Sequence, residues 1–235
     1  CTADYILAME EAGADLIEIG IPFSDPTAEG PVIQEANVRA LKAGMPVEGV
    51  FQIVEKVREK SQVPLVFLTY LNPVFHYGYE AFLGRCRSLG VDGLIIPDLP
   101  YEEKGELAPL AASYDVDVIS MIAPTSRQRI QMIAAESRGF IYVVSSMGVT
   151  GVRSEIETDL ASITETIRKV TDTPTAIGFG ISTPRQAREM ASVADGAIVG
   201  SAIVKIIEKY QDKAREPLMN YGRGMKEAVR KADCC

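Results

Sequence analysis

Residues 16–31 read L-I-E-I-G-I-P-F-S-D-P-T-A-E-G-P, and this stretch decides both the fold and the chemistry that the sequence suggests. Its first six residues are rich in β-branched side chains and have the length of a strand, so a strand is predicted there. Glu18 interrupts this apolar run, and a carboxylate is costly to bury unless it has a partner or a function. A turn-rich loop follows and carries Asp25 and Glu29.

Two carboxylates on a strand and its following loop are typical of general acid–base catalysis. Such chemistry needs one protonated donor and one ionised acceptor, in environments that separate their pKa values. Glu18 and Glu29 are therefore candidate catalytic residues. From the residues alone, a second interpretation stays open, in which Glu18 faces solvent or pairs with a lysine or arginine.

The composition predicts one globular domain over residues 1–235. A chain of 235 residues with 47% hydrophobic content can bury one sizeable core. Its net charge of −8, without a basic stripe, argues against nucleic acid as a partner. The longest apolar runs are too short to span a membrane. We therefore expect neither nucleic acid nor a membrane as a partner.

The cysteines and the single histidine suggest neither a metal site nor a disulfide framework. The four cysteines are at positions 1, 86, 234 and 235, without the spacing of metal ligands. His76 is predicted to lie in a surface loop, and no second histidine could help it hold a metal. We expect a reduced, cytoplasmic protein that contains no metal.

Strand-like and helix-like segments alternate along the chain. Apolar, β-branched runs predict seven strands, at residues 16–21, 64–70, 93–99, 116–123, 140–145, 175–179 and 196–199. Helical spacing is found at residues 3–12, 47–60, 79–88, 101–113, 127–137, 160–170, 184–192 and 202–209. Strict alternation with short joints predicts an α/β fold with parallel strands, a (β/α)8 TIM-type barrel. A closed barrel of this type has eight strands, so we expect that this chain lacks the first one.

Active sites of such barrels lie at the carboxyl ends of the strands, and several candidate residues are found there. Glycines follow the last two predicted strands, at Gly180 and Gly200, and Ser201 begins a helix. Either glycine alone would indicate an ordinary turn, but both loops together, with backbone N–H groups and a helix N-terminus, predict a phosphate site. Tyr70 and Tyr142 are expected either to line the pocket or to fill the core. The loop at residues 147–152 has glycine hinges and is a candidate lid.

The motifs at residues 17–31, 148–151, 178–182 and 200–205 resemble those of the tryptophan synthase alpha subunit family. The P-F-S-D-P-x-A-[DE]-G-P run is highly specific, and G-F-G-I-S and G-S-A-I-V-K support it. The resemblance covers essentially the whole chain. It implies a lyase that cleaves indole-3-glycerol phosphate to indole and glyceraldehyde 3-phosphate in tryptophan biosynthesis. It further implies an α2β2 heterotetramer in which pyridoxal phosphate belongs only to the beta subunit, with no cofactor in this chain.

The resemblance also implies roles for individual positions. Glu18 matches the catalytic glutamate, and Glu29 stands where the family's second acid is usually aspartate. With Tyr70 included, the expected substrate-binding residues are Tyr70, Tyr142, Thr150, Gly151, Phe179, Gly180, Gly200 and Ser201. The residues expected to face the beta subunit are Asp25, Pro26, Asn72 and Phe75.

Glu29 is one methylene longer than aspartate, so its carboxylate must be retracted or its loop shifted. We expect the site to remain active because the acid function is kept. Two other interpretations stay open: a standalone indole-producing lyase, and a barrel that docks on and activates the beta subunit with little or no activity of its own. Phosphosugar isomerases and synthases with the same barrel would need a catalytic lysine at a strand end, and the sequence has none there.

Overall fold

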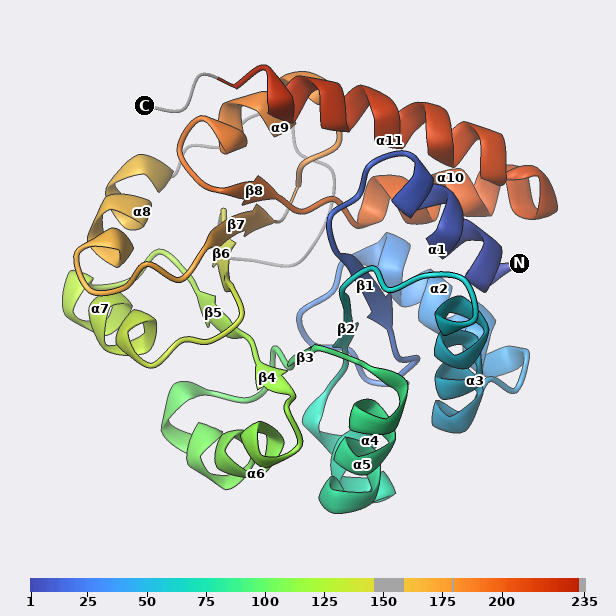
Figure 1. The fold of residues 1–235 in the computed structure, drawn as a ribbon, viewed down its shortest axis with the longest axis horizontal. Helices are drawn as coiled ribbons and strands as arrows, with labels where there is room; N and C mark the ends of the chain where they lie inside the picture. The colour runs from blue at the N-terminus through green and yellow to red at the C-terminus, as the bar shows by residue number, and fades with distance from the viewer. Residues whose placement is uncertain (146–158, 179, 233–235) are drawn as a thin grey trace.

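The strands form a curved inner wall that helices surround (Figure 1). The structure, a computed structural model, describes residues 1–145, 159–178 and 180–232. The strands are β1 (Ile17–Gly20), β2 (Leu65–Leu68), β3 (Gly93–Ile95), β4 (Asp117–Val118), β5 (Ser120–Ile122), β6 (Ile141–Val144), β7 (Thr175–Gly178) and β8 (Gly196–Ala197). They form two four-stranded sheets of parallel pairs, in the orders β1-β2-β3-β4 and β5-β6-β7-β8.

The helices form the outer layer. They are α1 (Thr2–Glu11), α2 (Pro31–Lys42), α3 (Val47–Arg58), α4 (Leu71–Tyr77), α5 (Tyr79–Leu89), α6 (Ala108–Ser113), α7 (Arg127–Ala135), α8 (Leu160–Arg168), α9 (Pro184–Ala191), α10 (Ser201–Tyr210) and α11 (Arg215–Arg230). Two short 3-10 helices, η1 (Tyr101–Glu106) and η2 (Gln211–Lys213), precede α6 and α11. In the part of the chain that the structure describes, none of these helices has the length and apolar character needed to cross a membrane.

All seven predicted strand segments contain a strand, but the run at residues 116–123 is divided between two sheets. The N–H of Ile119 still bonds the carbonyl of Leu94 on β3, at 2.9 Å. The next residue, Ser120, already pairs with Ile141 on β6. The prediction of one continuous strand there was wrong, because the chain changes its hydrogen-bonding partner at this point of the wall.

Three helices, α2, α4 and α11, were not predicted. Helix α2 has no buried residue, so its apolar pattern is weak. The side chain of Asp98 accepts a hydrogen bond from the N–H of Leu71 at the start of α4, at 2.9 Å. His76 lies in the last turn of α4 and is exposed; its placement in a loop was therefore wrong. Helix α11 contains two glycines and packs against α9 and α1.

Side chains alternate between the two faces of the wall. On β2, Leu65 and Phe67 join the core between strands and helices, whereas Val66 and Leu68 belong to a separate cluster with Tyr142. This second cluster fills the space that the curved wall of strands encloses, because successive residues of a strand point to opposite faces.

Tyr142 occupies the interior at a point where its neighbour must be glycine. A Cβ atom built on Gly178 of β7 would lie 2.5 Å from Cζ of Tyr142 and 2.6 Å from its Cε1. The absence of a side chain at Gly178 therefore allows the tyrosine ring to lie against the adjacent strand.

Helices from the two ends of the chain pack together. Figure 1 shows α1 beside α11. A Cβ atom built on Gly222 would lie 2.8 Å from Cβ of Ala12, so the two segments approach closely. Lys226 of α11 pairs with Asp15 at 2.5 Å, and Arg215 pairs with Glu11 at 2.7 Å.

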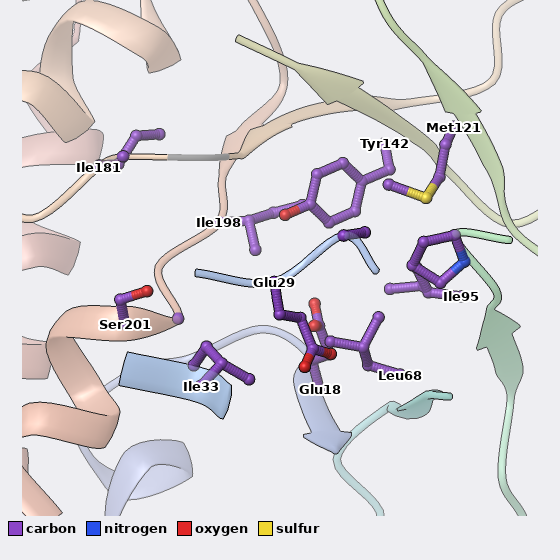
Figure 2. A pocket seen from close by; sticks show the side chains of 14 residues that line it. Glu18, Glu29, Ile33, Leu68, Ile95, Met121, Tyr142, Ile181, Ile198 and Ser201 are labelled. Carbon is purple, nitrogen blue, oxygen red and sulfur yellow. The ribbon is translucent and has the colours of Figure 1, made fainter. Parts of the chain in front are cut away.

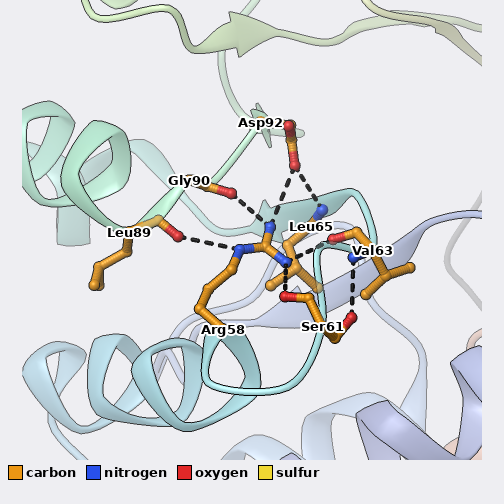
Figure 3. A network of polar contacts seen from close by, with 7 residues as sticks. All are labelled: Arg58, Ser61, Val63, Leu65, Leu89, Gly90 and Asp92. Carbon is orange, nitrogen blue, oxygen red and sulfur yellow. Dashed lines mark hydrogen bonds and ion pairs between the residues drawn. The ribbon is translucent and has the colours of Figure 1, made fainter.

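Arg58 connects three segments at the amino-terminal side of the sheet (Figure 3). Its guanidinium donates to the carbonyls of Leu89 and Gly90 after α5, at 3.2 and 2.6 Å. It also donates to the carbonyl of Val63 before β2, at 2.8 Å, and lies 3.6 Å from the carboxylate of Asp92. Burial lowers the pKa of Arg58, while the charge of Asp92 opposes that effect. One side chain thus satisfies several backbone acceptors that no secondary structure pairs.

Replacing Arg58 with methionine should lower the free energy of unfolding by about 2–4 kcal/mol, because the partly buried carbonyls would lose their donor. Urea denaturation measures this. The matched control is Arg138→Met. It removes an exposed guanidinium whose Nε lies 3.3 Å from Oδ1 of Asp117. The control should change stability by less than about 0.5 kcal/mol. Equal effects of the two substitutions would contradict the role given to Arg58.

Replacing Gly178 with alanine should destabilise the protein by about 1–3 kcal/mol, because the new methyl group would overlap the Tyr142 ring. Thermal and urea unfolding measure the loss. Gly196→Ala on β8 is the control, since a Cβ there would meet its nearest neighbour, Cβ of Ala176, at an ordinary 3.6 Å. A Gly178→Ala protein as stable as the Gly196→Ala protein would disprove the packing argument.

Candidate active site

A cavity opens at the carboxyl ends of the strands, and residues from both sheets line it (Figure 2). The lining residues are Glu18, Ala28, Glu29, Ile33, Leu68, Ile95, Pro97, Met121, Tyr142, Gly180, Ile181, Ile198, Gly200 and Ser201. Six of the residues predicted for the site are among them. Glu18, Glu29 and Tyr142 lie close together in Figure 2, and Ser201 lies at the opposite side of the cavity.

Glu18 faces the interior because of its position on β1. Its neighbours Ile17 and Ile19 are both buried in the core between strands and helices, so the alternation of the strand directs Glu18 to the other face. Burial, with a further contribution from the charge of Glu29, raises the pKa of Glu18 to about 7. At neutral pH this carboxyl group can therefore both donate and accept a proton. The alternative of a solvent-facing or ion-paired Glu18 is not supported, since the residue lines the cavity and Glu29 lies beside it.

Glu29 is held in place by helix α2, which begins two residues later. The side-chain amide of Asn37 donates to Oε2 of Glu29 at 2.7 Å, and Gln34 donates to the backbone carbonyl of Glu29 at 2.7 Å. Glu29 is 5% exposed. Burial raises its pKa, and the hydrogen bond from Asn37 acts in the opposite direction. The donor on Asn37 thus favours the ionised form of Glu29.

The loop that carries Glu29 rests on Tyr70. The hydroxyl of Tyr70 accepts a hydrogen bond from the N–H of Ala28 at 2.9 Å, and its ring stacks on Phe23 with centroids 5.3 Å apart. The N–H of Phe23 also donates to Oδ1 of Asn37 at 3.3 Å. Tyr70 is 2% exposed and is not among the residues that line the cavity. Tyr70 therefore supports the loop through its contacts with Ala28 and Phe23.

The opposite end of the cavity includes two glycines and the start of a helix. Gly180 follows β7 with φ of +89°, which a residue with a side chain rarely adopts. Gly200 is the N-cap of α10, and Ser201 is its first residue. The first N–H groups of a helix have no partner within the helix, so this end of the cavity is suited to an anion.

Apolar side chains between these two ends were not predicted. Leu68, Ile95 and Met121 come from interior-facing positions of three strands, and Ile33 and Ile198 add to them. The period-two alternation along each strand was the signal that could have identified the first three. Among the described residues, no group of three histidine, cysteine, aspartate or glutamate side chains is arranged to hold a metal ion. The cavity can thus take a ligand with a flat apolar part and an anionic end, next to two carboxyl groups.

The remaining predicted residues fall into two sets. Thr150, Gly151, Phe179 and the candidate lid at residues 147–152 lie outside the described residues. Asp25 and Asn72 are exposed, Pro26 is half-buried, and Phe75 is 66% exposed. These four belong to the segments that follow β1 and β2, and the stacking of Phe23 on Tyr70 links the two segments.

Known proteins of one family resemble this chain over nearly its whole length. The family model described as the tryptophan synthase alpha chain matches residues 1–230. The tryptophan synthase alpha chain of Lacticaseibacillus casei is 51% identical over 228 residues, which cover 97% of this chain and 86% of that one. The corresponding protein of Lactiplantibacillus plantarum is 53% identical over 229 residues, with the same two shares.

The fold comparison gives the same result. A chain in a structure of the tryptophan synthase α2β2 complex from Pyrococcus furiosus is similar with a TM-score of 0.84 and 33% identity, over 96% of this chain and 91% of that one. The similarity confirms the predicted (β/α)8 TIM-type barrel, and in the part of the chain that the structure describes no strand precedes α1. The chain belongs to the tryptophan synthase alpha chain family.

Proposed function

We propose that this chain is a carbon–carbon lyase that cleaves indole-3-glycerol phosphate to indole and glyceraldehyde 3-phosphate. The observation that carries the proposal is one cavity in which Glu18 and Glu29 lie together across from the start of α10. An apolar middle suits an indole ring, and a backbone-lined end suits a phosphate. Membership of the tryptophan synthase alpha chain family selects this substrate from others with the same shape.

Glu18 is the proposed proton shuttle of a retro-aldol cleavage. Its carboxylic acid protonates C3 of the indole ring, which creates an iminium at the ring nitrogen. The resulting carboxylate then accepts the proton of the glycerol hydroxyl next to the ring. As that hydroxyl becomes a carbonyl, the bond between C3 and the side chain breaks, and its electron pair returns to the iminium. A pKa of about 7 supports both halves of this exchange at neutral pH.

Glu29 is the proposed electrostatic partner. Its ionised carboxylate accepts a hydrogen bond from the indole N–H and stabilises the positive charge that develops there. The hydrogen bond from Asn37 supports this role, because it orients Oε2 and partly offsets the rise in the pKa of Glu29 that burial causes. The same bond explains how a glutamate can serve where the family usually has aspartate: Asn37 holds the longer side chain in place.

The phosphate group is assigned to Gly180, Gly200 and Ser201, and Thr150, Gly151 and Phe179 stay predictions for the same substrate. Remote binding energy at the phosphate orients the reacting bond. The reaction needs proton transfer and charge stabilisation, both of which side chains of this chain can supply. No metal or organic cofactor is therefore proposed for this chain.

The proposed partner is a tryptophan synthase beta subunit, which holds pyridoxal phosphate and consumes the indole. Exposed Phe75, together with Asp25, Pro26 and Asn72, supports a contact surface beside the cavity. The relative from Pyrococcus furiosus is part of an α2β2 complex, and we propose the same assembly here, in the cytoplasm.

The direct test measures indole released from indole-3-glycerol phosphate by this chain, with and without a beta subunit. Release that the beta subunit increases is the expected result. Equal release in both cases would instead assign a standalone lyase. No release from a folded chain, with the beta subunit still activated, would assign a non-catalytic partner.

Glu18→Gln and Glu29→Gln should each lower kcat by more than about 100-fold, since each removes a group that handles a proton or a developing charge. Indole release in the presence of the beta subunit measures both effects. Glu35→Gln on α2 is the control, because Glu35 is exposed and is not among the residues that line the cavity. Near-normal turnover by Glu18→Gln would refute the assignment of the proton shuttle.

The pH dependence of kcat/KM should show a loss of activity as the pH rises through about 7, because the first step needs protonated Glu18. Initial rates between pH 5.5 and 9, spaced by about half a unit, would resolve such a titration. A rate that stays constant up to pH 9 would contradict it.

The pH dependence of the free energy of unfolding is an independent measure of the pKa of Glu18. The folded-state pKa of Glu18 lies above its ordinary value of 4.5, so the folded protein holds this proton more tightly than the unfolded chain does. The contribution of Glu18 to stability is therefore complete below pH 4.5 and is lost as the pH rises to about 7. Glu18→Gln should remove this part of the pH dependence of unfolding.

A further inference from the structure

The segment Gly180–Ser182 begins at the end of the cavity to which the phosphate is assigned, and it carries no charged side chain. Gly180 and Ile181 line the cavity, and Ser182 follows them, two residues before α9 begins at Pro184. Gly180 has no side chain and adopts a positive φ, so its own backbone restricts the conformation of the segment less than another residue would. Any N–H group that this segment offers to a ligand must therefore be held in position by contacts outside the cavity.

Helix α9 holds one side of the segment. Oε1 of Gln186 accepts hydrogen bonds from the N–H and the hydroxyl of Ser182, at 3.0 and 3.2 Å. It also accepts one from the N–H of Thr183 at 3.1 Å. Gln186 and Thr183 form the capping box of α9. These bonds fix the N–H groups that follow the cavity, but they leave the carbonyl of Ser182 to another donor.

Helix α11 supplies that donor. The hydroxyl of Tyr221 donates to the carbonyl of Ser182 at 2.8 Å, across 39 positions of sequence. The ring of Tyr221 packs on the core cluster that contains Ile181 and Met190. Burial raises the pKa of Tyr221 to about 12, so the hydroxyl keeps its proton at any pH at which the enzyme would work. Figure 1 shows α11 lying against α9, which places the donor on a rigid support.

We propose that Tyr221 is a positioning residue for substrate binding, which sets the orientation of Gly180–Ser182 and thereby the affinity of the cavity for a phosphate group. This inference rests on the proposed function, because it assigns the phosphate to this end of the cavity. The peptide unit between Ser182 and Thr183 is held at both ends: its N–H donates to Gln186, and its carbonyl accepts from Tyr221. This peptide unit therefore cannot rotate. Donors that are already oriented bind an anion without the cost of ordering the loop. Tyr221 itself is not among the residues that line the cavity.

The test compares wild type with Tyr221→Phe, which keeps the ring and removes only the hydroxyl. KM for indole-3-glycerol phosphate and the Kd for inorganic phosphate should both rise by about threefold to tenfold, the range expected for one hydrogen bond. In the same experiment, kcat should change by less than about twofold, because the reacting groups are untouched. Tyr210→Phe at the end of α10 is the control, since Tyr210 is 41% exposed, and it should leave all three constants unchanged.

The outcomes separate the inference from the function on which it rests. If wild type cleaves the substrate and binds phosphate, but Tyr221→Phe has the same KM and Kd, the positioning role is overturned and the proposed function stands. If kcat and melting temperature fall while KM stays constant, Tyr221 serves stability alone, and the inference is again overturned. If wild type neither releases indole nor binds phosphate, the proposed function fails, and the inference fails with it.

Discussion

The site depends on the alternation of side chains along β1. Ile17 and Ile19 are buried against the surrounding helices, so Glu18 between them must face the interior of the barrel. There the scarcity of water raises its pKa towards neutrality, and the nearby charge of Glu29 raises it further. The burial of Ile17 and Ile19 on one face of the strand thus offsets the cost of burying Glu18 on the other face, where its raised pKa suits proton transfer.

Much of the fold could be predicted because strands carry a local signal. Each of the seven predicted strand segments contains a strand, and the acid within the first one proved to face the cavity. The division at Ile119 could not be predicted, since both halves of that run are equally apolar and only their partners differ. Helices α2 and α11 were missed for a related reason. Helix α2 has no buried residue, and α11 contains Gly222, which allows a close approach to the end of α1.

The site was predictable to the extent that its residues belong to motifs. Glu18, Glu29, Tyr142, Gly180, Gly200 and Ser201 all line the cavity. The residues that position them were not recognised, because their roles depend on contacts across the fold. Asn37 binds the carboxylate of Glu29 from the next helix, and Tyr70 lies beneath the loop, outside the lining of the cavity. Composition and spacing indicate which groups can react, whereas the contacts that orient those groups require the coordinates.

The packing of α1 against α11 has a consequence for how the protein is made. Lys226 and Asp15 are separated by 211 positions of sequence, and Arg215 and Glu11 by 204. Contacts of such separation form late, because a long stretch of chain must be ordered before its ends can meet. During synthesis, α1 therefore lacks this partner until α11 has been added to the growing chain. The apolar face of α1 that packs near α11, which includes Tyr5, therefore stays uncovered until α11 has been made.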